Sequence, residues 1–255
     1  MSEYPWSNIQ LFELLAGQGA GAAALDRARA AYAVAQRRHS AQYRPDGRPF
    51  VSHLVRTAGI LARHGEREAV VLAGLVHAVY AQGDFGATRP GATPTNRAVL
   101  RAVIGAEAED LVARYTAFAW SPESARRMLE DAEARRAIGA DILVMRIANE
   151  LEEALDGALA HVGARMRVET LDQLALSARL ARSIDRPGLG EAVDAVLAVE
   201  AERAAPAAAM GADGSYVLLP ASAAIRQVVR ARRLVGRLRR GLAGRALSRT
   251  GGSRP

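Results

Sequence analysis

The stretch R-E-A-V-V-L-A-G-L-V-H-A-V-Y-A, from Arg67 to Ala81, is the part of this chain that decides its fold. Apolar residues occupy nearly every position, on all sides of a helical wheel, and His77 is the only histidine among them. A helix that is apolar all round lies in the centre of a protein rather than on its surface. The pattern therefore predicts a central buried helix over residues 67–81.

Segments with helical periodicity lie on both sides of this stretch. The sequence predicts further helices over residues 22–38, 51–64, 96–104, 106–119, 122–137, 140–161, 166–184 and 189–203. Gly65 marks a helix end, and Ser121-Pro122 marks a helix start with serine as the cap. Loops with turn-forming Pro and Gly are predicted over residues 39–50 and 83–95. No convincing strand is found, and we predict an all-α fold.

The composition agrees with a helical, globular protein. Of the 255 residues, 50% are hydrophobic and 24% charged, which is enough apolar material for a packed core, and only 5% are aromatic. The absence of cysteine excludes disulfides, thiolate catalysis and cysteine-ligated zinc. The N-terminal M-S-E-Y-P-W-S shows no secretory signal, and the longest apolar stretch is too short to span a bilayer. We expect a soluble, cytoplasmic protein.

The positive charge of the chain is concentrated at its C-terminal end. The net charge is +7, but ten arginines and no acidic residue lie from Arg226 onward, and the rest of the chain holds 24 basic against 27 acidic residues. We expect an N-terminal segment (1–20), a helical domain (21–203), an Ala/Pro/Gly linker (204–219) and a basic helical tail (220–255).

The tail is predicted to form an amphipathic helix over residues 220–247. Such a helix could dock on the core, or it could lie on an anionic membrane surface and make the protein peripheral to the membrane. Nucleic acid is disfavoured as a partner, because no aromatic residues alternate with the arginines and no base-reading motif is present.

Three histidines lie in motifs that resemble a known superfamily. His39 to His53 read H-x4-R-x-D-G-x-P-F-x-x-H, with Arg44 as the arginine, and H-A-V follows at His77. This order resembles the HD superfamily, and within it the guanosine tetraphosphate hydrolases. The segments 99–116 and 144–153 resemble two further motifs of these hydrolases. The resemblance implies an HD-type helical bundle.

The resemblance also implies a degenerate metal site. In those hydrolases a divalent metal is held by two histidines and two aspartates, and the matching positions here are His53, His77, Ala78 and Asn149. The catalytic Glu-Asp pair of the family falls on Ala81 and Gln82. Hard cations prefer carboxylate oxygen, so the site is expected to bind no metal, or a divalent metal weakly.

A second resemblance is to an uncharacterised HD-like family. Its motifs match H-L-V-R-T from His53, A-G-L-V-H-A-V-Y from Ala73 and A-N-E-L-E from Ala148. Membership would make Ala78 and Asn149 part of that family's own pattern, and it implies no known reaction.

The third motif lies on a predicted helix whose polar residues share one face. These are Arg146, Asn149, Glu150 and Glu153. The face could be a solvated stripe with an Arg146–Glu150 ion pair, or it could face the histidines, with Glu150 or Glu153 replacing a missing carboxylate. Similarly, His77 could be a hydrogen-bonded core residue, and His39 could cap the loop that follows it.

Three functional hypotheses follow. The first is an HD-like domain that binds a small phosphorylated or nucleotide-like ligand without ordinary phosphohydrolase activity. The second is a metal-dependent hydrolase with a rebuilt site, and the third is a membrane-surface scaffold. Catalytic residues and enzymatic activity are left open. The candidate ligand-binding residues are His39, Arg44, Arg146 and Glu153, and the candidate metal ligands are His53, His77, Asn149 and Glu150.

Overall fold

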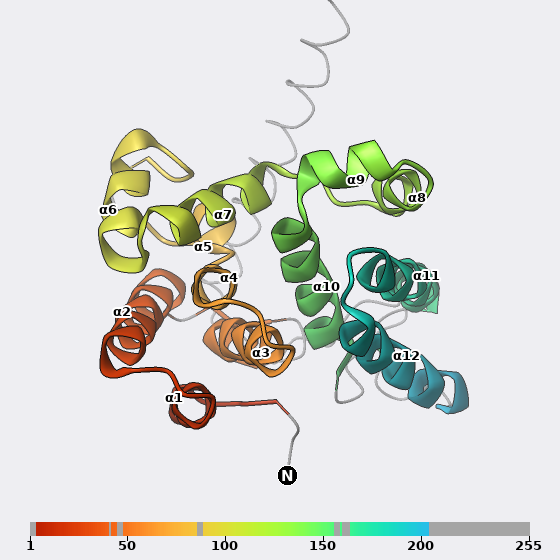
Figure 1. Cartoon of the computed structure of the whole chain (residues 1–255), viewed down its shortest axis with the longest axis horizontal. Helices are drawn as coiled ribbons and strands as arrows, with labels where there is room; N and C mark the ends of the chain where they lie inside the picture. Colours follow the sequence, from red (N-terminus) through yellow and green to blue (C-terminus); the bar gives the residue numbers. More distant parts are fainter. Residues whose placement is uncertain are drawn as a thin grey trace, which may run out of the picture. The chain divides into compact units, whose positions relative to one another are not determined.

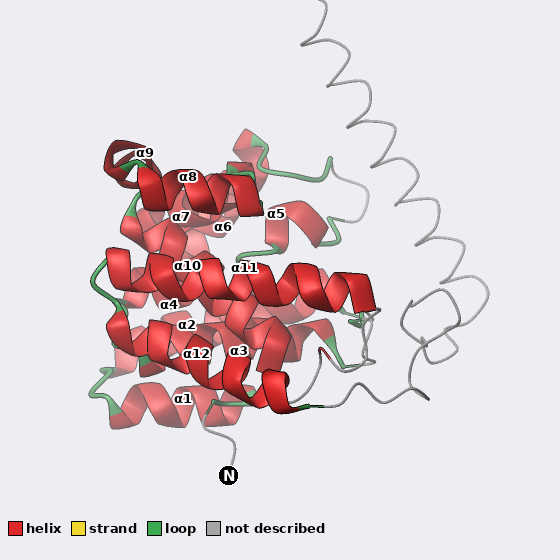
Figure 2. Cartoon of the chain, turned by 90° about the vertical axis from the view of Figure 1, so that its right-hand side faces the viewer, coloured by secondary structure: helices red, strands yellow, loops and turns green. Residues whose placement is uncertain are grey.

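A computed structural model describes residues 4–40, 42–44, 48–85, 89–155, 159 and 164–203. The described part of the chain is helical and contains no strand, only an isolated bridge between Tyr43 and Pro49 (Figure 2). The all-α prediction is confirmed for the residues that the structure describes.

The described residues form twelve helices (Figure 1). Their bounds are α1 Asn8–Gly17, α2 Ala22–His39, α3 Phe50–Arg63, α4 Glu68–Leu75, α5 Val79–Gln82, α6 Pro94–Ile104, α7 Ala106–Ala117, α8 Pro122–Glu130, α9 Ala132–Ile138, α10 Ala140–Ala154, α11 Ala164–Ser183 and α12 Pro187–Glu202.

Helix α4 lies in the centre of this arrangement, as the apolar stretch predicts. Every residue from Val70 to Leu75 is buried. Figure 1 shows α4 with α2, α3, α7 and α10 around it, and α4 contacts all four. The burial of apolar surface on all sides of α4 supplies the main driving force for packing these helices together.

The prediction of one continuous helix over 67–81 is wrong. Helix α4 ends at Leu75, Val76 leaves helical geometry with φ −126°, and α5 begins only at Val79. The physical reason is the buried His77, whose Nδ1 bonds to the carbonyl oxygen of Gly74 at 2.8 Å. A buried ring N–H needs an acceptor, and here it takes a backbone carbonyl at the end of the helix.

Two other predicted helices are also shorter than expected. The helix predicted over 122–137 is divided at Asp131, whose carboxylate accepts hydrogen bonds from the backbone N–H groups of Glu133 (2.8 Å) and Ala134 (3.0 Å) and so caps α9. Helix α10 ends at Ala154 because Leu155 is extended (ψ 157°), short of the predicted residue 161. The other predicted helices agree with α2, α3, α6, α7, α11 and α12 within a few residues.

The predicted N-terminal segment contains α1, which packs on α2 and α3. Ser7 and Gln10 form a capping box at its start, and Leu11 is fully buried. The chain before α1 also lies close to α3: a Cβ built on Gly59 would be 2.2 Å from Cγ of Pro5, so only glycine permits this contact.

The predicted linker (204–219), the basic tail (220–255) and the Pro45-Asp46-Gly47 turn lie outside the described residues. Among the helices of the described residues, none is both long enough and apolar enough to cross a membrane.

Candidate functional site

Five ring side chains, from α2, α3, the turn between α4 and α5, and α7, form one continuous row inside the bundle. The centroid distances are 4.9 Å for His39–Phe50, 5.4 Å for Phe50–His53, 5.3 Å for His53–His77 and 5.2 Å for His77–Tyr115. All but Phe50 are buried. The structure therefore brings His53 and His77 together, in a T-shaped contact, across the interior of the bundle.

His39 is the last residue of α2 and is held by the loop that follows. Its Nδ1 lies 2.8 Å from Oε1 of Gln42, and the amide nitrogen of Gln42 donates to the carbonyl oxygen of Gln82. This second bond identifies the Gln42 oxygen as the acceptor, so Nδ1 of His39 is the donor. Burial lowers the pKa of His39. The ring is therefore neutral, and its Nε2 is buried without a hydrogen-bond partner in the described part of the chain.

His77 lies in the turn between α4 and α5. Burial, followed by the neighbouring His53, lowers the pKa of His77 far below its usual value. Its Nδ1–H donates to the carbonyl oxygen of Gly74, so Nε2 carries the free lone pair of a neutral imidazole.

His53 is paired with a carboxylate that the sequence interpretation did not select. Its Nδ1 hydrogen-bonds to Oε2 of Glu152, on α10, and both side chains are almost completely buried. Burial opposes ionisation of Glu152, but His53, Arg44 and Arg48 outweigh it and lower the pKa of Glu152 overall. Arg44 lies 3.7 Å and Arg48 3.8 Å from the carboxylate oxygens.

Arg44 connects this pair to the predicted polar face of α10. A second guanidinium nitrogen of Arg44 lies 3.6 Å from Oε1 of Glu153, which also accepts a hydrogen bond from Asn149 at 3.2 Å. The Nε of Arg44 is buried with no hydrogen-bond partner among the described residues. We call the connected residues the polar cluster: His39, Arg44, Arg48, His53, His77, Asn149, Glu152 and Glu153.

Arg146 and Glu150 lie beside the polar cluster and form no direct ion pair. The guanidinium of Arg146 lies 3.9 Å from the ring centroid of Tyr115 and donates to the carbonyl oxygens of Tyr115 (3.3 Å) and Phe118 (3.4 Å). Burial, followed by the charge of Glu153, raises the pKa of Glu150 to about 8, although Arg146 opposes the shift.

The donor set does not fit an ordinary HD-type metal centre. Within the described ranges, no group of three His, Cys, Asp or Glu side chains could hold a metal ion. Ala78 and Asn149 occupy the two expected carboxylate positions and are buried there, and Glu152 is bonded to Nδ1 of His53 instead. Of the expected ligands, His53 and His77 remain, and each can offer its Nε2 atom.

Sequence reasoning missed Glu152 and Tyr115. Glu152 could have been found, because it is the last residue of the A-N-E-L-E motif and lies three residues, about one helical turn, after Asn149. Tyr115 gave no such signal, since a tyrosine in an amphipathic helix is usually part of the core.

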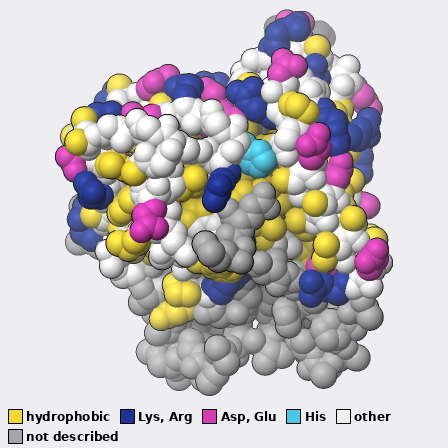
Figure 3. Space-filling model, turned by 60° about the horizontal axis from the view of Figure 1, so that its bottom comes forward, with side chains coloured by type: hydrophobic (Ala, Val, Ile, Leu, Met, Phe, Trp, Pro, Cys, Tyr) yellow, Lys and Arg dark blue, Asp and Glu magenta, His cyan; other side chains and the backbone are white. Residues whose placement is uncertain are grey.

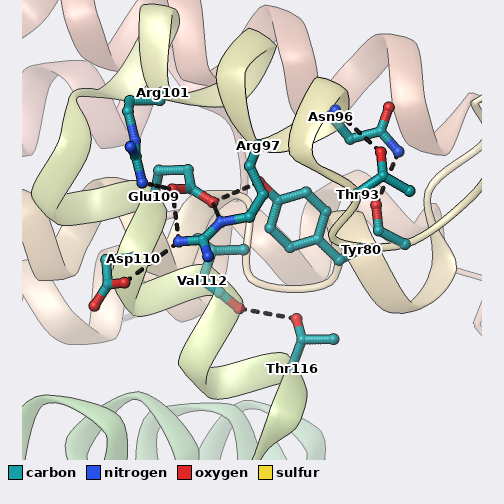
Figure 4. Close-up of polar contacts among 10 residues, drawn as sticks. Tyr80, Thr93, Asn96, Arg97, Arg101, Glu109, Asp110, Val112 and Thr116 are labelled. Atoms are coloured by element: carbon teal, nitrogen blue, oxygen red, sulfur yellow. Dashed lines mark hydrogen bonds and ion pairs between the residues drawn. The ribbon is translucent and has the colours of Figure 1, made fainter.

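A second buried glutamate, Glu109, lies in a separate network (Figure 4). Its carboxylate accepts hydrogen bonds from Tyr80 (2.8 Å), Arg97 (2.7 and 3.0 Å) and Arg101 (2.8 Å). Tyr80 ends the A-G-L-V-H-A-V-Y motif. The tyrosine of that motif therefore serves to connect α5, α6 and α7, and it does not reach the polar cluster.

Two surface cavities, of about 560 and 500 Å³, are lined by other parts of the molecule. The first lies along α6. The second is lined by Tyr4, His64, the end of α10 and one side of α12. Figure 3, in which the lower side of Figure 1 comes forward, shows apolar side chains in the middle of this face with a histidine and basic side chains near them.

Comparisons with known proteins give limited similarity. Residues 34–119, about a third of the chain, match the family described as a domain of unknown function (DUF6817). The match includes His39, His53 and His77 and ends before Asn149. No curated protein matches the chain.

Among solved structures, one similar chain is reported under the words "A metazoan ortholog of SpoT hydrolyzes ppGpp and plays a role in starvation responses". It is 16% identical to this chain with a TM-score of 0.49, and the similarity covers 71% of this chain and 97% of that chain. The activity named there is that of the metazoan protein.

Proposed function

We propose that the polar cluster binds a small anionic ligand of the phosphorylated or nucleotide-like kind, in an HD-like domain with a degenerate metal site. The cluster does not perform ordinary phosphohydrolase chemistry. Its arginines supply the positive charge that a divalent metal supplies in a metal-dependent hydrolase.

The state of Arg44 is the observation that carries this proposal. Its guanidinium lies 3.6–3.7 Å from the carboxylates of Glu152 and Glu153, beyond hydrogen-bonding distance, and its Nε has no partner in the described part of the chain. A buried donor without a partner costs about 1–3 kcal/mol. Phosphate oxygens suit the fork of an arginine, so a ligand of this kind would remove the cost.

Hydrolysis is disfavoured by the residues at the reacting positions. Phosphate ester hydrolysis of the HD type needs a metal that activates water and groups that transfer protons. The matching positions hold Ala78 and Asn149 for the metal carboxylates and Ala81 and Gln82 for the acid–base pair.

Calorimetric titration of the full chain with inorganic phosphate, pyrophosphate and nucleoside phosphates tests the proposal. We expect Arg44→Gln to weaken binding about tenfold or more, because a hydrogen bond to a charged group contributes about 1.5–3 kcal/mol. Arg165→Gln is the matched control, since Arg165 is 91% exposed on α11 and carries the same charge. Equal losses in the two variants would show non-specific charge attraction and exclude the site.

A rebuilt metal site is the second candidate function. It is favoured by the fixed Nδ1 atoms of His53 and His77, which bond to Glu152 and to the backbone and leave both Nε2 atoms for another contact. Outer partners hold metal-binding histidines in this way. Asn149 and Glu150 are the proposed further ligands. Elemental analysis of the purified wild-type protein should find one metal ion per chain, and the His53→Ala and His77→Ala variants should contain none. A wild-type protein that contains less than stoichiometric metal excludes this candidate.

Membrane attachment through residues 220–247 is proposed from the sequence alone. Co-sedimentation with vesicles containing phosphatidylserine should recover the full chain and not a chain truncated after residue 210. Equal recovery of the two would exclude attachment through the tail.

A further inference from the structure

Two more buried hydrogen-bond donors without partners lie between α7 and α10, next to the polar cluster. The side chain of Tyr115 is 4% exposed, and its ring contacts His77 on one side and the guanidinium of Arg146 on another. Neither the hydroxyl of Tyr115 nor Nε of Arg146 has a hydrogen-bond partner among the residues that the structure describes. Figure 1 shows α7 and α10 as neighbours, and the two helices are in contact.

Both groups are donors under physiological conditions. The hydroxyl of a tyrosine carries a proton near neutral pH and can donate it. The Nε–H of arginine can only donate. Buried polar groups nearly always have a partner, and two adjacent donors without one indicate that an acceptor from outside the described chain belongs there.

The acceptor should be uncharged. Glu150 and Glu153 lie four and seven residues after Arg146 and share its face of α10, so carboxylates already bring negative charge to this side of the helix. A carbonyl oxygen accepts two hydrogen bonds through its two lone pairs and adds no net charge.

The subsite is continuous with the site of the anion. The ring of Tyr115 contacts His77 and the ring of His77 contacts His53. His53 is bonded to Glu152, whose carboxylate lies 3.7 Å from Arg44. One small molecule with two polar ends can therefore use both places.

We infer that Tyr115 and Arg146 form a second subsite, which receives a neutral carbonyl oxygen of the same ligand whose anionic group binds at Arg44. The inference rests on the proposed function and narrows it to ligands that combine an anionic group with a carbonyl group. The carbonyl accepts one hydrogen bond from the Tyr115 hydroxyl and one from Nε of Arg146.

The first test uses the protein without ligand. In Tyr115→Phe a buried hydroxyl without a partner is removed, and we expect Tm to rise by roughly 2–4 °C. Tyr32→Phe is the matched control, because Tyr32 is a partly exposed tyrosine on α2 whose ring packs on Phe12, and its Tm should not change. A fall in Tm for Tyr115→Phe would mean that the hydroxyl already has a partner, such as an ordered water, and would overturn the inference.

The second test compares hydroxyacetone phosphate with propyl phosphate, which has a CH₂ group in place of the carbonyl. Calorimetry on the full chain should show the carbonyl compound binding about 3- to 10-fold more tightly, the gain typical of one or two neutral hydrogen bonds. Tyr115→Phe and Arg146→Lys should reduce this difference and leave the affinity for propyl phosphate unchanged. Arg44→Gln should weaken both compounds.

The outcomes separate the two proposals. Equal affinity of the wild-type protein for the two compounds overturns the subsite and leaves the anion site standing. An affinity difference that survives in Tyr115→Phe also overturns it. Failure of both compounds to bind removes the proposed function and, with it, the subsite.

Discussion

Two buried glutamates in this molecule have opposite surroundings. Glu109 is saturated, with Tyr80, Arg97 and Arg101 all hydrogen-bonded to it at 2.7–3.0 Å. Glu152 has one close partner, His53, and its arginines lie 3.7–3.8 Å away. A saturated carboxylate has no capacity for a ligand, so its network is structural.

Buried polar atoms without a partner within the described ranges lie near Glu152, and others belong to Trp120 and, on α11, to Arg167, Gln173 and Ser177. His39, Arg44, Tyr115 and Arg146 each have a buried polar atom without a partner within the described ranges, and all four lie in or beside the polar cluster. A protein normally satisfies such groups, and exceptions mark sites that function requires to be open. The proposed ligand site lies around Glu152, whereas the network of Glu109 connects α5, α6 and α7.

The largest effect should come from breaking the saturated network. Glu109→Ala leaves a buried tyrosine hydroxyl and two arginines without their acceptor, and we expect the free energy of unfolding to fall by about 2–4 kcal/mol. Urea denaturation measures it. Glu107→Ala, at a residue 68% exposed, is the control and should change it little. If Glu109→Ala lowers the free energy of unfolding by less than about 1 kcal/mol, the network of Glu109 does not stabilise the fold and the contrast with Glu152 is lost.

A second expected effect concerns Glu150, whose pKa of about 8 is above that of an unfolded glutamate. Such a group favours the folded state at low pH, and this contribution is lost as the pH rises through 8. Glu150→Gln should therefore raise the free energy of unfolding by about 1–3 kcal/mol at pH 9 relative to the wild type, and by less at pH 5. Urea denaturation of both proteins at pH 5 and pH 9 measures this difference. An equal change in the free energy of unfolding at the two pH values would show that ionisation of Glu150 is not its cause.

Glu152→Gln should sharpen the contrast in binding. The amide can still contact His53, but the negative charge beside Arg44 and Arg48 is lost. We expect phosphate to bind about tenfold more tightly, because a repulsive charge a few ångströms away contributes on the order of 1–4 kcal/mol in a partly screened site. Titration calorimetry measures the change, and the same substitution at Glu109 should leave phosphate binding unaltered. Weaker binding by Glu152→Gln would mean that the carboxylate itself contacts the ligand.

The smallest effect is a pH dependence of stability caused by the buried imidazoles. The pKa values of His39 and His77 are lowered by burial, so the neutral rings favour the folded state above the usual histidine pKa, and this stability is lost as the pH falls below it. The buried imidazoles therefore add a downward slope to the free energy of unfolding from about pH 7 to pH 5, which opposes the contribution of Glu150 over the same range. His77→Leu should reduce that slope, and the control Arg165→Gln should leave it unchanged. An unchanged slope in His77→Leu would show that protonation of His77 does not lower the free energy of unfolding.

Local features of this protein could be predicted from the sequence because they depend on neighbouring residues. Ser121 caps α8 in a capping box, Gly65 follows α3 with a positive φ of 73°, and the apolar stretch at Val70 to Leu75 is buried. The helix breaks at His77 and Asp131 were not predicted, because each depends on a hydrogen bond between a polar side chain and one particular backbone group.

The sequence by itself determined that this chain forms a helical bundle around an apolar helix, and that alanine and asparagine stand at positions 78 and 149. Only the tertiary structure decided that Glu152 pairs with His53, 99 residues away, and that Arg146 lies on Tyr115 instead of pairing with Glu150. Periodicity selects the face of a helix, but the partner of a buried side chain is selected by the packing of helices that are distant in sequence.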